Sequence, residues 1–265
     1  MAEPADRRDV DLRPDEMSCD AWLGGRLSLI QPRRGHRAGT DAVLLAAAAG
    51  FPQGRFADVG AGAGAVALAI LSRSPGAGAD LVEIDADLAS LAAGNAARNG
   101  LAAQTRIFQL DVCDGSVRRA AGLADGEADA VVTNPPFFDP ATVRVSPDRA
   151  RARAYVFGGE TGAAPLAAWI RACLAILKSG GRFVMIHRPE ALTAIVAAAH
   201  NRLGALALLP VHPRAGAPAH RLLVSGVKGS KAPLRLASGL VLHEADGRLT
   251  GEADAIHRGQ ALIEF

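Results

Sequence analysis

The sequence predicts an α/β fold in which a parallel sheet is covered by helices on both faces. From about residue 54 onward, short apolar runs of strand type alternate with Ala- and Leu-rich runs of helical type, and a glycine-rich stretch follows the first strand. Strands that alternate with helices favour a parallel sheet, because each helix crosses over the sheet between two strands. Hydrophobic residues at 49% and charged residues at 21% are typical of a globular chain.

The individual elements follow in order along the chain. Strands are expected over 55–60, 80–85, 105–112, 129–134, 180–187, 205–212 and 220–227, which makes seven, and helices over 63–74, 86–99, 115–122, 164–178 and 189–203. The connection 213–219 is too short for a helix, so the last two strands should be antiparallel neighbours. This organisation predicts a flexible, charged leader over 1–20, one main domain over 21–230 and a small strand-rich extension over 231–265.

Composition excludes several classes of protein. The net charge of +2 is too small to imply nucleic-acid binding by itself. The three cysteines are widely spaced without a C-x-x-C pair, and no histidine cluster has metal-ligand spacing, so neither a disulfide framework nor a metal site is expected. The longest apolar run, 42–51, is too short to span a membrane, and the charged N-terminus does not resemble a signal peptide. A cytoplasmic protein is therefore expected.

Glycines and acidic residues mark the carboxyl ends of the first three strands. Gly60, Gly62 and Gly64 lie between the first strand and a helix, where backbone can approach a ligand closely. Glu83 ends the second strand, where a carboxylate can accept hydrogen bonds from ribose hydroxyls, and Asp111 follows the third. Taken singly, Glu83 could be a helix-start anion and Asp111 a turn former; together with the glycines they predict a nucleoside site.

The glycine pattern alone leaves two cofactor classes open. A dinucleotide motif would place its third glycine at position 65, where Ala65 is a permitted variant, so NAD is not excluded. The fourth strand favours the other class, because it runs into Asn134-Pro135-Pro136-Phe137. Proline disfavours helix in the residue before it and cannot donate to a sheet, so Asn134 is held extended at the strand's end. An enzyme that transfers a methyl group to a planar amine needs such a rigid bend, whereas a dehydrogenase has no evident need of it.

These motifs resemble a known family. Asp58-Val-Gly-Ala-Gly, Glu83 and Asn134-Pro135-Pro136-Phe137 are similar to those of class I S-adenosylmethionine-dependent methyltransferases that methylate amines. More narrowly, the segments "GHRAGTDAVLLAA", "NPPFF", "SPDRARARAY" and "AHRLLVSGVKG" resemble the bacterial tRNA adenine-N6-methyltransferases, which modify the adenosine beside the anticodon of a valine tRNA. The similarity covers nearly everything from about residue 22 onward. Phe137 departs from the motif, in which tyrosine is common; the missing hydroxyl should leave stacking intact, and it puts the base preference in question.

The resemblance implies a Rossmann-like seven-stranded sheet with strand order 3-2-1-4-5-7-6 and S-adenosylmethionine as the cofactor. It implies cofactor contacts to Asp58, Gly60, Gly62, Glu83, Asp111 and Asn134, and a segment with Gly39, Thr40 and Asp41 that closes over the methionine end. Asp41 could instead cap the helix that begins at Ala42. Asn134, Pro135, Pro136 and Phe137 would act in catalysis, with Phe137 stacking on the base.

The expected substrate is an adenine N6 in RNA, in a tRNA anticodon loop, because the amine must be unpaired or flipped out. Basic residues near the motif could bind phosphates, although each cluster could equally be a solvated face: Arg33, Arg34, Arg37, Arg149, Arg151 and Arg153. The same fold could methylate a guanine N2 in ribosomal RNA, an adenine in DNA or a glutamine amide in protein. A protein that binds the cofactor and RNA without turnover, and an NAD-dependent oxidoreductase, are the remaining alternatives.

Overall fold

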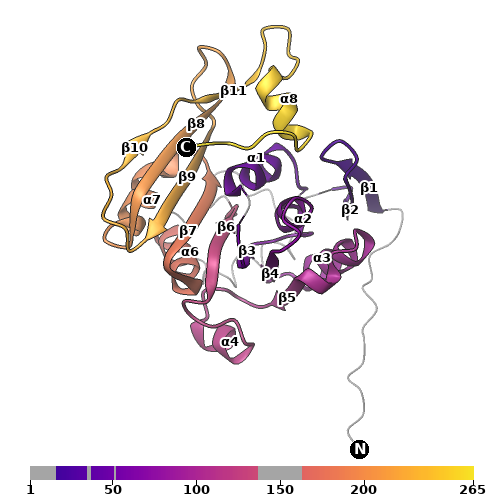
Figure 1. Ribbon diagram of the computed structural model, residues 1–265, viewed down its shortest axis with the longest axis vertical. Helices are drawn as coiled ribbons and strands as arrows, with labels where there is room; N and C mark the ends of the chain where they lie inside the picture. The colour runs from indigo at the N-terminus through magenta and orange to yellow at the C-terminus, as the bar shows by residue number, and fades with distance from the viewer. Residues whose placement is uncertain (1–15, 35–36, 51, 137–162) are drawn as a thin grey trace, which may run out of the picture.

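The computed structural model describes residues 16–34, 37–50, 52–136 and 163–265 (Figure 1). Several residues with predicted roles lie outside these ranges, namely Phe137, Arg149, Arg151 and Arg153. Their roles therefore stay predictions.

The core of the protein is a nine-stranded sheet with the order β10-β8-β9-β7-β6-β3-β4-β5, in which β11 also pairs with β8. Strands β3 to β7 are mutually parallel, and β9 is antiparallel to both β7 and β8, as the short connection between β8 and β9 predicts. The bounds are β3 (Arg55–Val59), β4 (Gly78–Glu83), β5 (Thr105–Gln109), β6 (Ala128–Thr133), β7 (Leu177–His187), β8 (Leu203–Arg214), β9 (Arg221–Lys228), β10 (Arg235–Leu236) and β11 (Leu240–His243).

The expectation of seven strands is wrong. Numbered from β3, the path from β5 to β8 reads 3-2-1-4-5-7-6, but the sheet continues past β8 to β10, and β11 pairs with β8 as well. Both additional strands come from residues 231–265, which were expected to form a separate strand-rich extension. Apolar side chains of this segment, such as Leu242 and Ile256, are buried in the same core as α1 and α2. The segment also contains a helix, α8, which lies beside α1 (Figure 1).

Helices cover both faces of the sheet because alternate strand residues point to opposite sides. Phe56 and Val132 pack with α1, α2 and α3, whereas Ala57 and Val131 pack with α6 and α7. The helices are α1 (Thr40–Ala49), α2 (Ala65–Leu71), α3 (Ala86–Arg98), α4 (Gly115–Ala120), α6 (Ala163–Ile176), α7 (Leu192–Ala199) and α8 (Gly251–His257), with short 3-10 turns η2 (Ala102–Gln104) and η4 (Pro189–Ala191). No helix among the described residues is long and apolar enough to cross a membrane.

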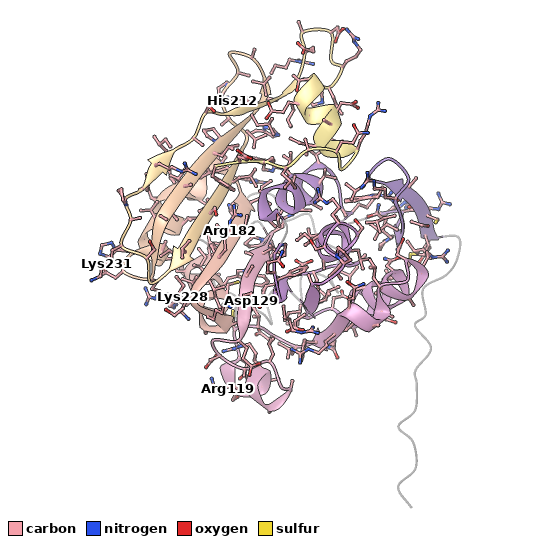
Figure 2. The ribbon with its side chains drawn as sticks, viewed as in Figure 1. Arg119, Asp129, Arg182, His212, Lys228 and Lys231 are labelled. Atoms are coloured by element: carbon pink, nitrogen blue, oxygen red, sulfur yellow. The ribbon has the colours of Figure 1, made fainter. Side chains whose placement is uncertain are left out.

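Two half-buried cations connect the helices to the sheet. Arg182 on β7 (Figure 2) donates to the carbonyl of Ala48 in the last turn of α1, at 3.1 Å, and to the hydroxyl of Ser225 on β9, at 3.0 Å. Lys228 on β9 donates to the carbonyls of Leu174 and Leu177 at the junction of α6 and β7. These side chains satisfy carbonyls that helix ends leave without an intrahelical partner.

A separate antiparallel hairpin precedes the main sheet. It consists of β1 (Met17–Trp22) and β2 (Leu27–Pro32), and its tight turn contains Gly24 and Gly25 with φ values of +66° and +90°. The hairpin lies beside α3 (Figure 1). Because β1 begins at Met17, the last part of the expected flexible leader 1–20 is a strand.

Candidate active site

A left-handed glycine turn connects β3 to α2. Gly60, Gly62 and Gly64 have φ values of +75°, +55° and +87°, a region that side chains with a Cβ rarely adopt. A Cβ on Gly60 would lie 3.1 Å from the ring of Trp169, and one on Gly64 would lie 3.3 Å from the Cβ of Ala92. A Cβ on Gly62 would meet nothing within 4 Å. The turn is therefore packed tightly at Gly60 and Gly64, whereas the space beside the Cα of Gly62 is open to a ligand.

Asp58 lies at the end of β3 below this turn and is almost fully buried, with 1% of its surface exposed. Its Oδ2 accepts a hydrogen bond from the backbone N–H of Ala67 at 3.0 Å, which satisfies a donor in the first turns of α2. Burial raises the pKa of Asp58 to about 7, the hydrogen bond from Ala67 opposes this shift, and the nearby charge of Glu83 adds to it. Asp58 thus changes its charge near neutral pH, directly beneath the glycine turn.

Glu83, at the end of β4, holds the other side of the turn. Its Oε2 accepts from the N–H of Gly62 at 2.8 Å, and its Oε1 accepts from the N–H groups of Ile84 and Asp85 at 2.9 and 3.0 Å. Burial raises the pKa of Glu83, and these three hydrogen bonds oppose the shift. Because a carboxylate has about four acceptor positions, Glu83 keeps capacity for a ribose hydroxyl.

Asp111 faces the same small cavity as Glu83. Its Oδ1 accepts from the N–H of Cys113 at 2.8 Å, so its role as a turn former is confirmed. The cavity has a volume of about 30 Å³ and is lined by Gly60, Val82, Glu83, Ile84, Leu110, Asp111, Val112 and Trp169. Apolar walls with two carboxylates suit a nucleoside, but this volume holds no more than about one or two waters, so a base enters only if the walls separate.

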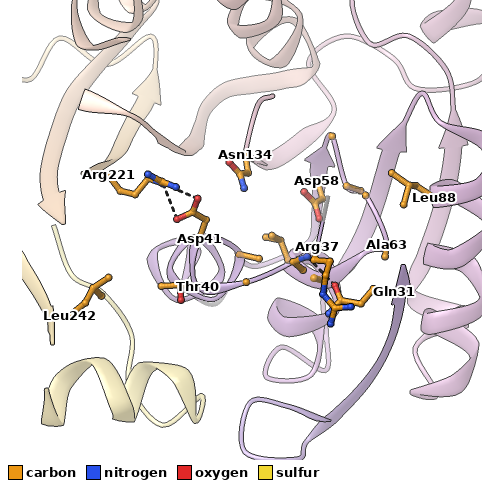
Figure 3. A pocket seen from close by; sticks show the side chains of 18 of the residues that line it. Gln31, Arg37, Thr40, Asp41, Asp58, Ala63, Leu88, Asn134, Arg221 and Leu242 are labelled. Carbon is orange, nitrogen blue, oxygen red and sulfur yellow. Dashed lines mark hydrogen bonds and ion pairs between the residues drawn. The ribbon is translucent and has the colours of Figure 1, made fainter. Parts of the chain in front are cut away.

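A larger cavity of about 350 Å³ lies on the other side of Gly60 (Figure 3). It brings together seven of the residues that were expected at the site: Arg37, Gly39, Thr40, Asp58, Gly60, Gly62 and Asn134. Glu83 and Asp111 line the small cavity and not the large one, and Gly60 lines both. Arg33 and Arg34 are exposed and do not line it. Two cavities that share Gly60 and have different walls suit a ligand with a nucleoside at one end and a charged amino-acid group at the other.

Asn134 occupies a rigid position on the rim of the large cavity. The preceding residue, Thr133, donates its hydroxyl to the carbonyl of Val59 at 2.8 Å and accepts from the indole N–H of Trp169 at 2.9 Å. Pro135 is buried and Pro136 is half-buried. The backbone carbonyl of Asn134 would lie 3.9 Å from a Cβ on Gly60, so the end of β6 and the glycine turn are direct neighbours. Figure 3 shows the side chain of Asn134 between Asp58 and the pair formed by Asp41 and Arg221.

Asp41 does not cap α1. The N-cap is Gly39, which has no side-chain cap. The Asp41 carboxylate instead accepts the Nε–H of Arg221, which is shared between its two oxygens at 3.0 and 2.8 Å. This ion pair joins the start of α1 to the start of β9 across the cavity.

Arg37, expected on an RNA-binding rim, donates to Asp20, Ser18 and the carbonyl of Pro32. Its charge is therefore used in part to fix the hairpin.

Among the residues of the site that were not expected from the sequence are Trp169, Arg221 and Gln31. Trp169 and Arg221 reach the site from elements distant in sequence, and no local pattern identifies their partners. Gln31 is 2% exposed, donates to Asp20 at 2.7 Å and accepts from the N–H of Ala38 at 2.9 Å. The sequence does contain a signal for Gln31. Apolar and polar residues alternate on both sides of Gly24-Gly25, which is typical of a hairpin, and Gln31 lies near the end of its second strand.

Comparisons with known proteins agree with this geometry. Residues 38–148 match the family model of the methyltransferase small domain. A predicted O-methyltransferase from Agrobacterium tumefaciens is 30% identical, with a TM-score of 0.70 over 84% of this chain and 98% of that one. Comparison with curated proteins yields no match.

Two more distant structures share the fold. An S-adenosylmethionine-dependent O-methyltransferase from Thermotoga maritima is 17% identical, with a TM-score of 0.51 over 75% of this chain and 68% of that one. TYW2 from Pyrococcus horikoshii, in complex with MeSAdo, is 14% identical, with a TM-score of 0.54 over 82% of this chain and 73% of that one. The family decides between the two cofactor classes that the glycine pattern left open. The chain belongs to the class I S-adenosylmethionine-dependent methyltransferases, and S-adenosylmethionine is its cofactor.

Proposed function

We propose that the protein transfers the methyl group of S-adenosylmethionine to N6 of an adenine in RNA, in a tRNA anticodon loop. The observation that carries this proposal is the position of Asn134, which lines the same cavity as Asp58, Gly60 and Gly62 at the end of a strand stiffened by Pro135 and Pro136. The narrower choice of substrate rests on the resemblance of the sequence to tRNA adenine-N6-methyltransferases.

The chemistry requires a polar side chain at this position. The exocyclic amine of adenine is a poor nucleophile because its lone pair is delocalised into the ring. If the side-chain oxygen of Asn134 and the carbonyl of Pro135 accept the two amine N–H bonds, the nitrogen is held toward the methyl group and its lone pair is partly localised. Positioned dipoles of this kind can contribute several kcal/mol without a strong base.

The surroundings of Asn134 support such positioning. Thr133 is fixed on two sides, by the carbonyl of Val59 and by the indole of Trp169. Trp169 also packs against Gly60, so one side chain contacts both the acceptor end of β6 and the cofactor turn. The two reacting partners are thus held by one connected group of buried residues, which favours a constant distance between them.

Other acceptors suit the same bend. A guanine N2 in ribosomal RNA, an adenine N6 in DNA and a glutamine amide each present a planar nitrogen. The Agrobacterium protein is a predicted O-methyltransferase, so its expected acceptor atom is an oxygen. These acceptors differ in the macromolecule that must reach the cavity and in the atom that carries the methyl group. Both differences can be measured directly.

The test is transfer of labelled methyl from S-adenosylmethionine to total tRNA, ribosomal RNA, DNA and protein, followed by mass spectrometry of the labelled product. The proposal expects label in tRNA and its recovery as N6-methyladenosine, and expects this nucleoside to be missing from the corresponding tRNA of cells that lack the protein. Label recovered in another macromolecule, on a ribose oxygen or on another base overturns the choice of substrate.

A further inference from the structure

Two asparagines on α3 fasten the N-terminal hairpin to the main domain. Asn95 accepts from the N–H of Ile30 and donates to its carbonyl, both at 2.8 Å. One helical turn later, Asn99 makes the same pair of bonds with Ser28, both at 2.9 Å. The side chains are four residues apart on one face of α3, and their partners are two residues apart on one edge of β2. The two amides therefore bond to the backbone of β2 as a neighbouring strand would.

Asn95 and Asn99 differ in the third hydrogen bond that each side chain makes. Asn99 Nδ2 donates to the carbonyl of Asn95 within α3, at 2.8 Å. Asn95 Nδ2 instead donates to the carbonyl of Ala63 in the glycine turn, at 2.9 Å. Asn95 is 1% exposed, so this bond is made in a buried setting where loss of a partner is costly. Ala92, one turn earlier on α3, lies against Gly64 of the same turn. The glycine turn thus rests on α3 at two successive residues, Ala63 and Gly64.

We infer that Asn95 is a positioning residue that couples docking of the hairpin to binding of S-adenosylmethionine. The same amide group holds Ile30 of the hairpin and Ala63 of the cofactor turn, so displacement of either partner weakens the hold on the other. The hairpin also reaches the cofactor cavity through Gln31, which lines it and fixes Ala38 at the start of the segment that leads to Thr40.

The coupling must act in both directions, because linkage between two sites is reciprocal. Cofactor bound against the glycine turn should hold Ala63, and through Asn95 it should hold Ile30. The N–H groups of Ile30 and Ser28 report on the two docking points separately, since the first donates to Asn95 and the second to Asn99.

The test compares Asn95→Ala with Asn99→Ala, which is the matched control. Both variants lose a pair of bonds to the hairpin and one further bond, which in Asn99→Ala lies within α3 and in Asn95→Ala reaches the glycine turn. S-adenosylmethionine binding is measured by calorimetry, so the test does not depend on the acceptor. Asn95→Ala should weaken binding about fivefold, the factor for about 1 kcal/mol from one hydrogen bond, and Asn99→Ala by less than about twofold. In methyl transfer, KM for S-adenosylmethionine should rise in Asn95→Ala while kcat at saturating cofactor stays unchanged.

Hydrogen exchange of the wild-type protein provides a measurement that needs no variant. Saturating S-adenosylmethionine should slow exchange of the Ile30 N–H, and this protection should be lost in Asn95→Ala and retained in Asn99→Ala. Equal cofactor affinity in the two variants, or an Ile30 exchange rate that does not respond to cofactor, overturns the coupling. Failure of tRNA methylation would leave these results unaffected, because they concern only the cofactor.

Discussion

Replacement of Asp58 by asparagine should make the protein more stable at alkaline pH. Asparagine has nearly the same shape, keeps an oxygen that can accept from the N–H of Ala67, and carries no charge. The wild-type carboxyl is almost fully buried, and its pKa in the folded state is raised from 3.8 to about 7. Because the folded state binds this proton more tightly than the unfolded chain, wild-type stability falls as the pH rises from about 4 to about 7 and then stays level.

The size of the effect follows from the two pKa values. Each pKa unit corresponds to about 1.4 kcal/mol, so the raised pKa of Asp58 lowers the free energy of unfolding, relative to its value below pH 4, by about 4 kcal/mol at pH 8 and about 2 kcal/mol at pH 5. Asp58→Asn removes this loss at both pH values. The free energy of unfolding of the variant should therefore exceed that of the wild type by about 2 kcal/mol more at pH 8 than at pH 5.

Urea unfolding of both proteins at pH 5 and pH 8 measures this difference. The control is Asp87→Asn, because Asp87 is exposed in the first turn of α3 and its replacement removes no buried carboxyl. If the difference in free energy of unfolding between Asp58→Asn and the wild type is the same at both pH values, the raised pKa of Asp58 is refuted. The same variant should bind S-adenosylmethionine more weakly, since a negative charge beneath the glycine turn is lost from the cofactor cavity.

Three further predictions concern the same cavity. Gly64→Ala should lower the free energy of unfolding by about 1–3 kcal/mol, from left-handed strain plus crowding, and Gly62→Ala by about 1 kcal/mol from strain alone; thermal unfolding compares them. Thr133→Val should reduce the single-turnover rate of methyl transfer more than cofactor affinity, because the end of β6 loses its bond to β3. A double-mutant cycle of Asp41→Ala and Arg221→Ala should give a coupling energy of about 1 kcal/mol, and a value near zero contradicts the ion pair.

Local sequence signals predicted the parts of the fold that depend on local structure. Alternation of apolar strands and helices placed β3 to β9 correctly, and the short connection before Arg221 predicted the antiparallel pairing of β8 with β9. The glycines lie between β3 and α2, as their place in the sequence predicted, and the structure adds that their φ values are positive. The tail was only partly predicted, because the helix signal from Thr250, which caps α8 through the N–H of Ala253, was overlooked.

Contacts between distant segments could not be predicted in this way. Asn95 is an ordinary helix residue by sequence, and its bonds to Ile30 and Ala63 exist only because α3 packs between the hairpin and the glycine turn. Arg221 and Asp41 are 180 residues apart, and either could have been a solvated charge. Periodicity along the chain determines which face of an element is buried, but not which side chain on another element it meets.

The central claim is that the side-chain oxygen of Asn134 holds the acceptor amine. Single-turnover methyl transfer from S-adenosylmethionine to total tRNA tests it most directly, with Asn134→Asp, which keeps acceptor oxygens, compared with Asn134→Leu, which has a similar shape and none. Cofactor affinity, measured in parallel by calorimetry, separates this role from cofactor binding. We expect Asn134→Leu to lose at least about 100-fold in rate and Asn134→Asp to keep most of the activity that depends on the oxygen. Equal rates in the two variants, with cofactor affinity intact, would contradict the claim.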